Sequence, residues 1–184
     1  MQRSRIYRWI IGMFRVVLWA FFREVEVEGL ENLPREGEGG GILVAWHPNG
    51  MVDPGLIMTS FPRQVIFGAR HTGFKVPFMG WMMRVIGTVP IYRAMDTGDM
   101  NPAARREANM RSLDTLAQRV ADGSFSCLFP EGESHDGSQP MVFKSGTARF
   151  YYRARQLAPA GSPPPVIIPV GLHYDAKREF RSKA

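Results

Sequence analysis

The sequence predicts an α/β fold, with a mainly parallel central sheet flanked by helices and preceded by an N-terminal helix at a membrane interface. First, short apolar runs alternate with helical stretches from residue 41 to residue 174, the pattern of parallel strands joined by helical crossovers. Second, 184 residues support one sizeable core. Third, residues 6–22 are almost wholly apolar yet carry arginines. We therefore predict an interface helix over residues 1–23 and one domain over residues 24–184.

Composition excludes several classes of protein. With 45% hydrophobic and 22% charged residues, the chain is neither disordered nor collagen-like. Cys127 is the sole cysteine, so no intramolecular disulfide can form, and we expect a protein in the cytosol or facing it. The net charge is +6, and arginine supplies 19 of the 23 basic residues. Arginine favours bidentate phosphate contacts, although genomic composition bias explains such an excess equally well.

The first 23 residues hold five arginines and no acid. A spanning helix is disfavoured, because a charge near mid-bilayer costs about 2.5 to 3.5 kcal/mol. On a helical wheel the polar and basic positions share an arc of about 100°: Ser4, Arg5, Arg8, Gly12, Arg15, Trp19 and Arg23. The rest of the circumference is aliphatic and aromatic, which is typical of a helix lying in a membrane surface. A core helix of a soluble protein is the main alternative, and no small-residue cleavage site indicates a secretory signal.

Each further element follows from its local pattern. Residues 25–29 alternate at period two and residues 41–46 form a continuous apolar run, so both are predicted strands. Asp53-Pro54 offers a helix cap and first position for a helix through residue 61. Asn101-Pro102 and Gly123 delimit the clearest helix, over residues 101–122. Apolar runs predict further strands and two further helices: strands at 64–69, 88–92, 124–129 and 165–174, helices at 76–87 and 145–157.

His47 directly follows the buried strand, and Asp53 stands six residues later. The carboxyl ends of parallel strands line ligand sites, so both side chains are placed where a site forms. We expect residues 48–50 to turn and fold His47 back over Asp53, giving a base oriented by a carboxylate. Because no serine or cysteine lies in this segment, the substrate's own hydroxyl would be the nucleophile. A structural histidine held by an aspartate is the alternative.

A second polar segment, FPEGESH, follows the predicted strand 124–129. Its Glu131 and His135, with His47 and Asp53, lack the close spacings of zinc ligands, so we predict no metal site. Other strand ends bring cations to the same sheet edge, and a phosphate pocket is plausible there: Arg70, Arg93 and Lys144. Taken singly, each of these cations would be read as solvated surface.

Together the ordered blocks WHPNGMVDP, GTVPIYR, FPEGESH and VIIPVGL resemble the glycerophospholipid acyltransferase family over about residues 25–174. The resemblance implies acyl transfer from acyl-CoA or acyl carrier protein to a hydroxyl of glycerol-3-phosphate or a lysophospholipid. His47 would be the general base and Asp53 its orienter, with Arg93, Glu131 and Gly132 shaping the acceptor pocket. It further implies action at a membrane surface without a metal. With the N-terminal arginines and the lone cysteine, we expect an anionic phospholipid surface at the cytoplasmic face as the partner, no other cofactor and no nucleic acid.

This chain departs from the family pattern at three points. Five residues separate His47 and Asp53 where four are usual, a spacing similar to that of fungal and bacterial glycerol-3-phosphate acyltransferases. Ser134 stands where FPEGTR carries arginine, which leaves Arg93, Arg70 and Lys144 to hold a phosphate; Arg70 itself occupies a position that is often lysine. The chain also ends about ten residues after the fourth block, so we expect a C-terminally truncated domain. A lipid ester hydrolase and a non-catalytic peripheral lipid-binding homologue are the alternative functions.

Overall fold

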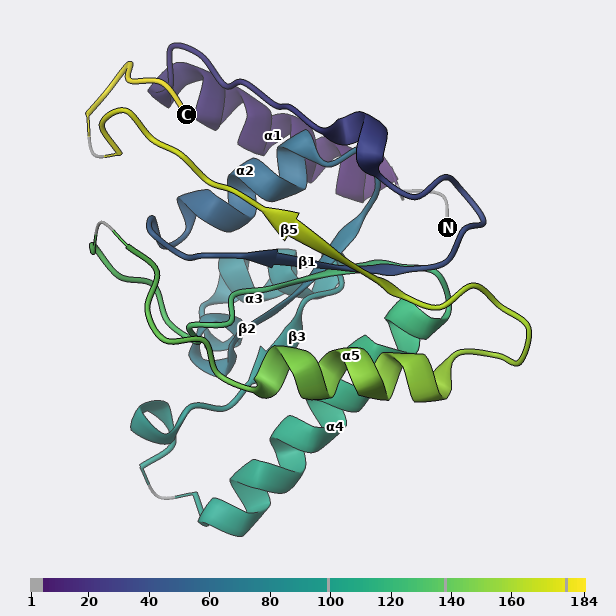
Figure 1. Ribbon diagram of the computed structural model, residues 1–184. Coiled ribbons are helices and arrows are strands. Elements are labelled where there is room, and N and C mark those ends of the chain that lie inside the picture. The colour runs from purple at the N-terminus through teal and green to yellow at the C-terminus, as the bar shows by residue number, and fades with distance from the viewer. Residues whose placement is uncertain (1–4, 99, 138, 178) are drawn as a thin grey trace.

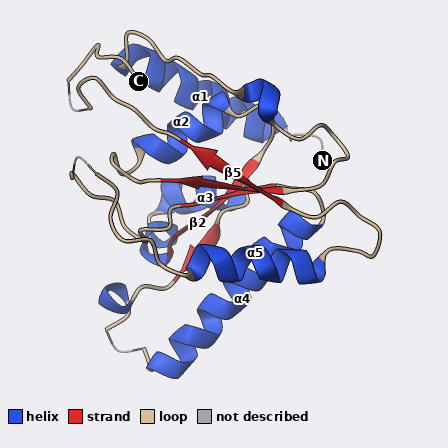
Figure 2. Ribbon diagram, viewed as in Figure 1, coloured by secondary structure: helices blue, strands red, loops and turns tan. Residues whose placement is uncertain are grey.

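The computed structural model describes residues 5–98, 100–137, 139–177 and 179–184. Within them the chain forms a five-stranded sheet in the order β3-β2-β4-β1-β5, and every pairing is parallel (Figures 1 and 2). The strands are β1 Gly41–Ala45, β2 Val65–Arg70, β3 Val89–Ile91, β4 Phe125–Leu128 and β5 Val166–Val170. Because all five run the same way, their carboxyl ends meet at one edge of the sheet, as the sequence pattern predicts.

Helices cover both faces of this sheet (Figure 1). The α-helices are α1 Arg5–Phe21, α2 Val52–Ser60, α3 Pro77–Val85, α4 Pro102–Ala121 and α5 Gly146–Leu157, and short 3₁₀ turns occupy Leu30–Asn32, His71–Lys75 and Ala94–Asp96. One core layer packs α1, α2 and α3 against Leu43 and Phe67. The other packs α4 and α5 against Ile42 and Ile66. Alternate residues of one strand thus serve opposite layers, which is why these strands read as continuous apolar runs.

The α1 helix has two different faces. Tyr7, Ile10 and Ile11 are buried in the layer with α2 and α3, as a core helix would be. A second apolar set on the same helix is more than half exposed: Ile6, Trp9, Val16, Val17 and Trp19. Ser4 and the preceding Arg3 lie outside the described residues. The helix therefore belongs to the domain core along one stripe and leaves its remaining apolar surface open.

No helix of the described residues combines the length and the apolar character that crossing a bilayer requires.

Two local predictions were wrong. Residues 25–29 are not a strand, since their backbone pairs with no sheet strand and Glu24 makes only an isolated bridge to Lys183. Residues 25–29 all border a groove beside β5, so the apolar and the acidic positions of the alternation share one environment. Asp53 is not the cap of α2 either: the helix begins at Val52, and no side chain caps it. The cap predicted for the long helix is confirmed, because the Asn101 side chain accepts a hydrogen bond from the Ala103 N–H.

Candidate active site at the carboxyl edge of the sheet

A turn after β1 brings His47 onto Asp53, as the sequence predicts. The His47 Nδ1 lies 2.7 Å from Asp53 Oδ2. Gly50, with φ of 41°, sits in the turn and accepts the left-handed backbone that most residues avoid. Because a carboxylate only accepts, the proton between these atoms belongs to Nδ1, and Nε2 keeps its lone pair. The arrangement leaves Nε2 as the ring nitrogen that faces away from Asp53.

Asp53 is fully buried, and its carboxylate is satisfied from three sides. Oδ2 also accepts the Asn49 N–H at 2.8 Å, and Oδ1 accepts the Tyr174 hydroxyl at 2.5 Å. These donors offset the cost of burying the carboxylate and hold its rotamer. Asp53 therefore acts on His47 from a fixed position instead of capping its own helix.

The His47 ring is held as firmly as its partner. It stacks on Phe129, with ring centroids 3.9 Å apart and planes 11° from parallel, and its side chain is 16% exposed. Phe129 follows β4, so neighbouring strands β1 and β4 supply the two halves of the stack. The remaining exposure leaves the imidazole reachable by a substrate.

Glu131 ties the loop after β4 to the turn after β1. It is fully buried; its Oε2 accepts the His47 backbone N–H at 2.7 Å, and its Oε1 accepts the Met141 N–H at 2.8 Å. The His135 Nε2 lies 2.9 Å from the same Oε1. Since both oxygens are engaged inside the protein, Glu131 fixes the His47 backbone.

His135 completes this arrangement. Its Nδ1 accepts the Gly137 N–H at 3.1 Å, so Nε2 carries the proton that is donated to Glu131. Burial raises the pKa of Glu131, but the donors from His135, Met141 and His47 outweigh it and hold that pKa below the ordinary range. Glu131 is therefore an anion at neutral pH. In the described part of the chain, no three His, Cys, Asp or Glu side chains are grouped as metal ligands.

The predicted phosphate-binding cations have different surroundings. Arg70 makes a bidentate pair with Asp96, with Nε 2.9 Å from Oδ2, and is half exposed. Arg93 is more buried and lies 3.3 Å from Glu133 Oε2, which links the end of β3 to the loop after β4. The structure thus leaves Arg93 nearer the FPEGESH loop than Arg70.

Lys144 lies over Gly132 in that loop. A Cβ on Gly132 would come within 2.9 Å of the Lys144 Nζ, and Gly132 has a φ of 77°. Glycine therefore serves both the turn and the close approach of the ammonium. Within the described residues the ammonium has no acidic partner, whereas Ser134, also in the loop, is exposed.

Sequence reasoning missed three contributors to this site. Tyr174 reaches Asp53, Phe129 stacks on His47, and Trp46 donates from Nε1 to the Leu172 carbonyl at 2.8 Å. Phe129 stands in the FPEGESH motif, and its place after a strand was the available signal. Nothing in local sequence indicates the Tyr174 contact, because 121 residues separate the partners.

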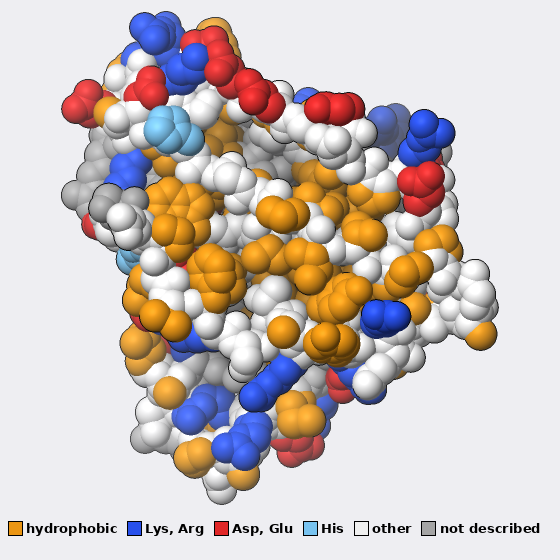
Figure 3. Space-filling model, in the orientation of Figure 1, with side chains coloured by type: hydrophobic (Ala, Val, Ile, Leu, Met, Phe, Trp, Pro, Cys, Tyr) orange, Lys and Arg blue, Asp and Glu red, His pale blue; other side chains and the backbone are white. Residues whose placement is uncertain are grey.

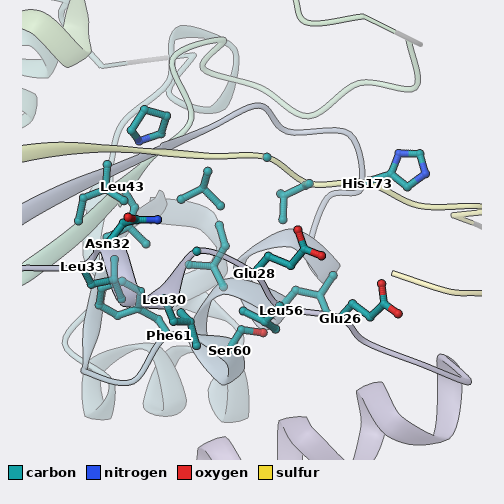
Figure 4. A pocket seen from close by; sticks show the side chains of 18 of the residues that line it. Glu26, Glu28, Leu30, Asn32, Leu33, Leu43, Leu56, Ser60, Phe61 and His173 are labelled. Carbon is teal, nitrogen blue, oxygen red and sulfur yellow. The ribbon is translucent and has the colours of Figure 1, made fainter.

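A separate groove of about 790 Å³ lies beside the outer edge of β5. It is bordered by residues 25–34 and α2, and Figure 3 shows it as an apolar hollow with acidic side chains along its upper rim. In the close view Leu43, Leu56 and Phe61 line it, while Glu26, Glu28 and His173 stand at one end (Figure 4). None of the predicted site residues lines this groove.

The fold and this edge define an α/β protein that presents an aspartate-held histidine at the carboxyl ends of parallel strands. The chain belongs to the Acyltransferase family, which matches residues 24–173. A Schizosaccharomyces pombe relative named an uncharacterized acyltransferase is 35% identical, with 100% of this chain and 38% of the relative covered. A chloroplastic 1-acyl-sn-glycerol-3-phosphate acyltransferase of Arabidopsis thaliana is 28% identical over 76% of this chain and 37% of its own. The chain thus spans less than two-fifths of the length of these two relatives.

A solved structure shares the fold. It is the crystal structure of the 1-acyl-sn-glycerophosphate acyltransferase PlsC from Thermotoga maritima, with a TM-score of 0.58 and 19% sequence identity. The likeness covers 94% of this chain and 72% of the PlsC chain. Its helix-flanked α/β architecture agrees with the fold class that the sequence predicts.

Proposed function

We propose that this protein transfers a fatty acyl group from an acyl thioester, acyl-CoA or acyl carrier protein, to a hydroxyl of glycerol-3-phosphate or a lysophospholipid. The observation that carries the proposal is the His47–Asp53 pair, with Nδ1 and Oδ2 2.7 Å apart at the carboxyl edge of the sheet. The family and the name of the Arabidopsis relative support acyl transfer to a lysophospholipid.

In this mechanism His47 Nε2 removes the proton of the acceptor hydroxyl, and the oxygen attacks the thioester carbonyl carbon. The tetrahedral intermediate collapses, the C–S bond breaks, and the imidazolium returns its proton to the leaving thiolate. Asp53 holds the tautomer and stabilises the transient imidazolium. Cys127 is unsuited to be a nucleophile, because it is buried and desolvation raises the pKa of its thiol. These steps require two substrates and no further cofactor.

The acceptor phosphate would be held by Arg93 and Lys144. Arg93 stands at the end of β3 beside Glu133, and Lys144 projects over Gly132 in the neighbouring loop. Both are cations in the loops around His47, and charge-assisted donors of this kind bind phosphate well. Arg70 would have to leave Asp96 before it could contribute.

The protein would work on the cytoplasmic face of a membrane, with α1 at the interface. Trp9, Val16 and Val17 are more than half exposed, and Arg5 and Arg8 are exposed on a flanking arc where they can reach anionic headgroups. Arg15 instead donates to the Thr59 carbonyl at 3.0 Å. An acceptor embedded in lipid would then be presented to a protein that is already at the surface.

The test is incubation of the protein with radiolabelled acyl-CoA or acyl carrier protein, together with glycerol-3-phosphate or lysophosphatidic acid in vesicles. Acylated lipid that depends on His47 supports the proposal. Free fatty acid in place of acylated lipid indicates a hydrolase, and neither product indicates a non-catalytic lipid-binding protein. The His47→Ala variant is the control for label transferred by contaminating enzymes.

A further inference from the structure

Tyr174 contacts the His47–Asp53 pair from just beyond the part of the chain that the family match covers. The match ends at residue 173, and β5 ends four residues before Tyr174 at Val170. The hydroxyl of Tyr174 lies 2.5 Å from Asp53 Oδ1, the carboxylate oxygen that His47 does not use. Asp53 thus has His47 on one oxygen and Tyr174 on the other.

The Tyr174 ring is positioned by the N-terminal helix. Its centroid lies 5.9 Å from that of Phe22, and the two rings belong to a small cluster with Leu18 and Leu56. Phe22 and Leu18 are buried, so the ring rests on a fixed surface built by α1 and α2. The Tyr174 side chain therefore connects α1 to the Asp53 carboxylate.

Lys177, three residues after Tyr174, also contacts the turn between His47 and Asp53. The Asn49 side-chain amide donates to the Lys177 carbonyl at 3.1 Å, and the Lys177 ammonium donates to the Pro48 carbonyl at 3.2 Å. Three contacts from residues 174–177 thus converge on the turn between His47 and Asp53. This is the arrangement expected of a support that fixes catalytic geometry.

Chemistry gives the Tyr174 contact a consequence for His47. A hydrogen bond donated to a carboxylate withdraws negative charge from it, and a less negative Asp53 stabilises the His47 imidazolium less. Burial raises the pKa of the Tyr174 hydroxyl, and Asp53 raises it further, so that the hydroxyl remains a donor at every pH at which the enzyme would work. The Tyr174 hydroxyl therefore contributes both to holding the Asp53 rotamer and to setting the basicity of His47.

We propose that Tyr174 is a positioning residue for the His47–Asp53 pair: it acts through Asp53, sets the basicity of His47, and is seated by the N-terminal helix. The inference rests on the proposed role of His47 as general base. Tyr174 itself does not touch the reacting atoms.

The first test is Tyr174→Phe, which removes the hydroxyl and keeps the ring on Phe22. Loss of a hydrogen bond to a charged group should lower kcat by about tenfold or more, while both KM values stay within about twofold. The ascending limb of kcat/KM against pH should move to higher pH, because Asp53 without its donor holds the imidazolium more strongly. Tyr152→Phe, an exposed hydroxyl on α5, is the matched control and should leave every parameter unchanged.

Other charged and titratable groups near the pair stay constant in this comparison. They are Glu131 at the His47 N–H, Lys177 with its partner Asp136 beside the turn, His135 against Glu131, and the buried Cys127 thiol near Asp53. The Tyr174→Phe substitution removes none of them. A shift in the ascending limb of the kcat/KM profile would therefore be due to loss of the contact between Tyr174 and Asp53.

The second test is the same substitution in an Asp53→Asn background. If Tyr174 acts through Asp53, the second substitution should add less than about twofold, since partners in one network are not additive. An equal loss in both backgrounds, with an unmoved pH profile, would overturn the proposal and leave Tyr174 a packing residue.

A third measurement needs no turnover. NMR titration of the His47 imidazole, assigned by comparison with His47→Ala, should show a higher pKa in Tyr174→Phe than in the wild type. An unchanged pKa overturns the inference about Tyr174 whether or not the protein transfers acyl groups. Absence of acyl transfer in the wild type overturns the proposed function, and the titration still decides the role of Tyr174.

Discussion

His47 and Asp53 form a hydrogen-bonded unit at the carboxyl edge of the sheet. Phe129 and the Glu131 carboxylate fix the ring and the backbone of His47, while Asn49 and Tyr174 fix Asp53. These four partners fix the geometry of the pair, whereas the His47 imidazole supplies its basic nitrogen. Substitution of His47 should therefore lower kcat more than substitution of a residue that only positions the pair.

At the residue scale, His47→Ala should lower kcat by about 10² to 10⁴-fold, the usual effect of removing a general base. Asp53→Asn should lower it nearly as much, because an amide can donate to Nδ1 and favour the wrong tautomer. Steady-state kinetics with both substrates check this. Activity within threefold of wild type for His47→Ala would remove the pair from the mechanism.

Arg93→Ala tests the phosphate site. Loss of a charge-assisted donor should raise the apparent KM for a phosphate-bearing acceptor by about tenfold or more, and a neutral acceptor should be used nearly as before. Arg84→Ala, which changes an exposed arginine in the last turn of α3, is the control. If both acceptors lose activity equally, Arg93 serves the acyl donor or the fold. If neither is affected, the acceptor carries no phosphate.

At the scale of elements, the loop after β4 depends on one buried carboxylate. Glu131 collects donors from His47, His135 and Met141, and through them it joins two loops that follow neighbouring strands. The His135 N–H adds a backbone hydrogen bond to the His47 carbonyl at 3.1 Å. The loop should therefore lose order when Glu131 loses its charge.

Glu131→Gln should lower the free energy of unfolding by about 2 kcal/mol at pH 7. The pKa of Glu131 is depressed in the folded protein, so its contribution is present above the unfolded value of 4.5 and is lost as pH falls through the folded value. Urea denaturation should thus show the difference between wild type and variant shrinking as the pH falls below 4.5. A difference that stays constant over this range would mean that Glu131 contributes shape and not charge.

At the scale of the whole molecule, α1 joins the core to the proposed membrane surface. Its buried stripe means that deleting the helix would remove Ile10 and Leu18 from the folded domain, so truncation cannot test membrane binding alone. Point substitutions on the two faces separate the roles.

Ile10→Ala should lower the free energy of unfolding by about 2 to 5 kcal/mol, the range for an emptied core site. Thermal or urea unfolding measures it. The matched change Ile6→Ala, on the half-exposed side of the same helix, should cost much less. Equal and small costs at both positions would show that α1 contributes little to the core.

Trp9→Glu with Val16→Glu should weaken binding to anionic vesicles by about tenfold or more, because each removes an apolar side chain from the interface and adds a repelled charge. Sedimentation with vesicles of defined anionic content measures it. Met110→Glu, at an exposed apolar position on α4, is the control and should bind as wild type. Unchanged sedimentation of the α1 variant would place the membrane contact elsewhere.

Sequence by itself determined the α/β class, the parallel sheet, most helix bounds and the His47–Asp53 turn, because periodicity, caps and strand-end positions are local. Tertiary structure decided what depends on distant partners. Residues 25–29 alternate like a strand but have no strand beside them. Asp53 resembles a cap but is held by His47 and Tyr174 instead. Only packing brings Tyr174 and Phe22 to that carboxylate, because contacts across the fold leave no trace in local spacing.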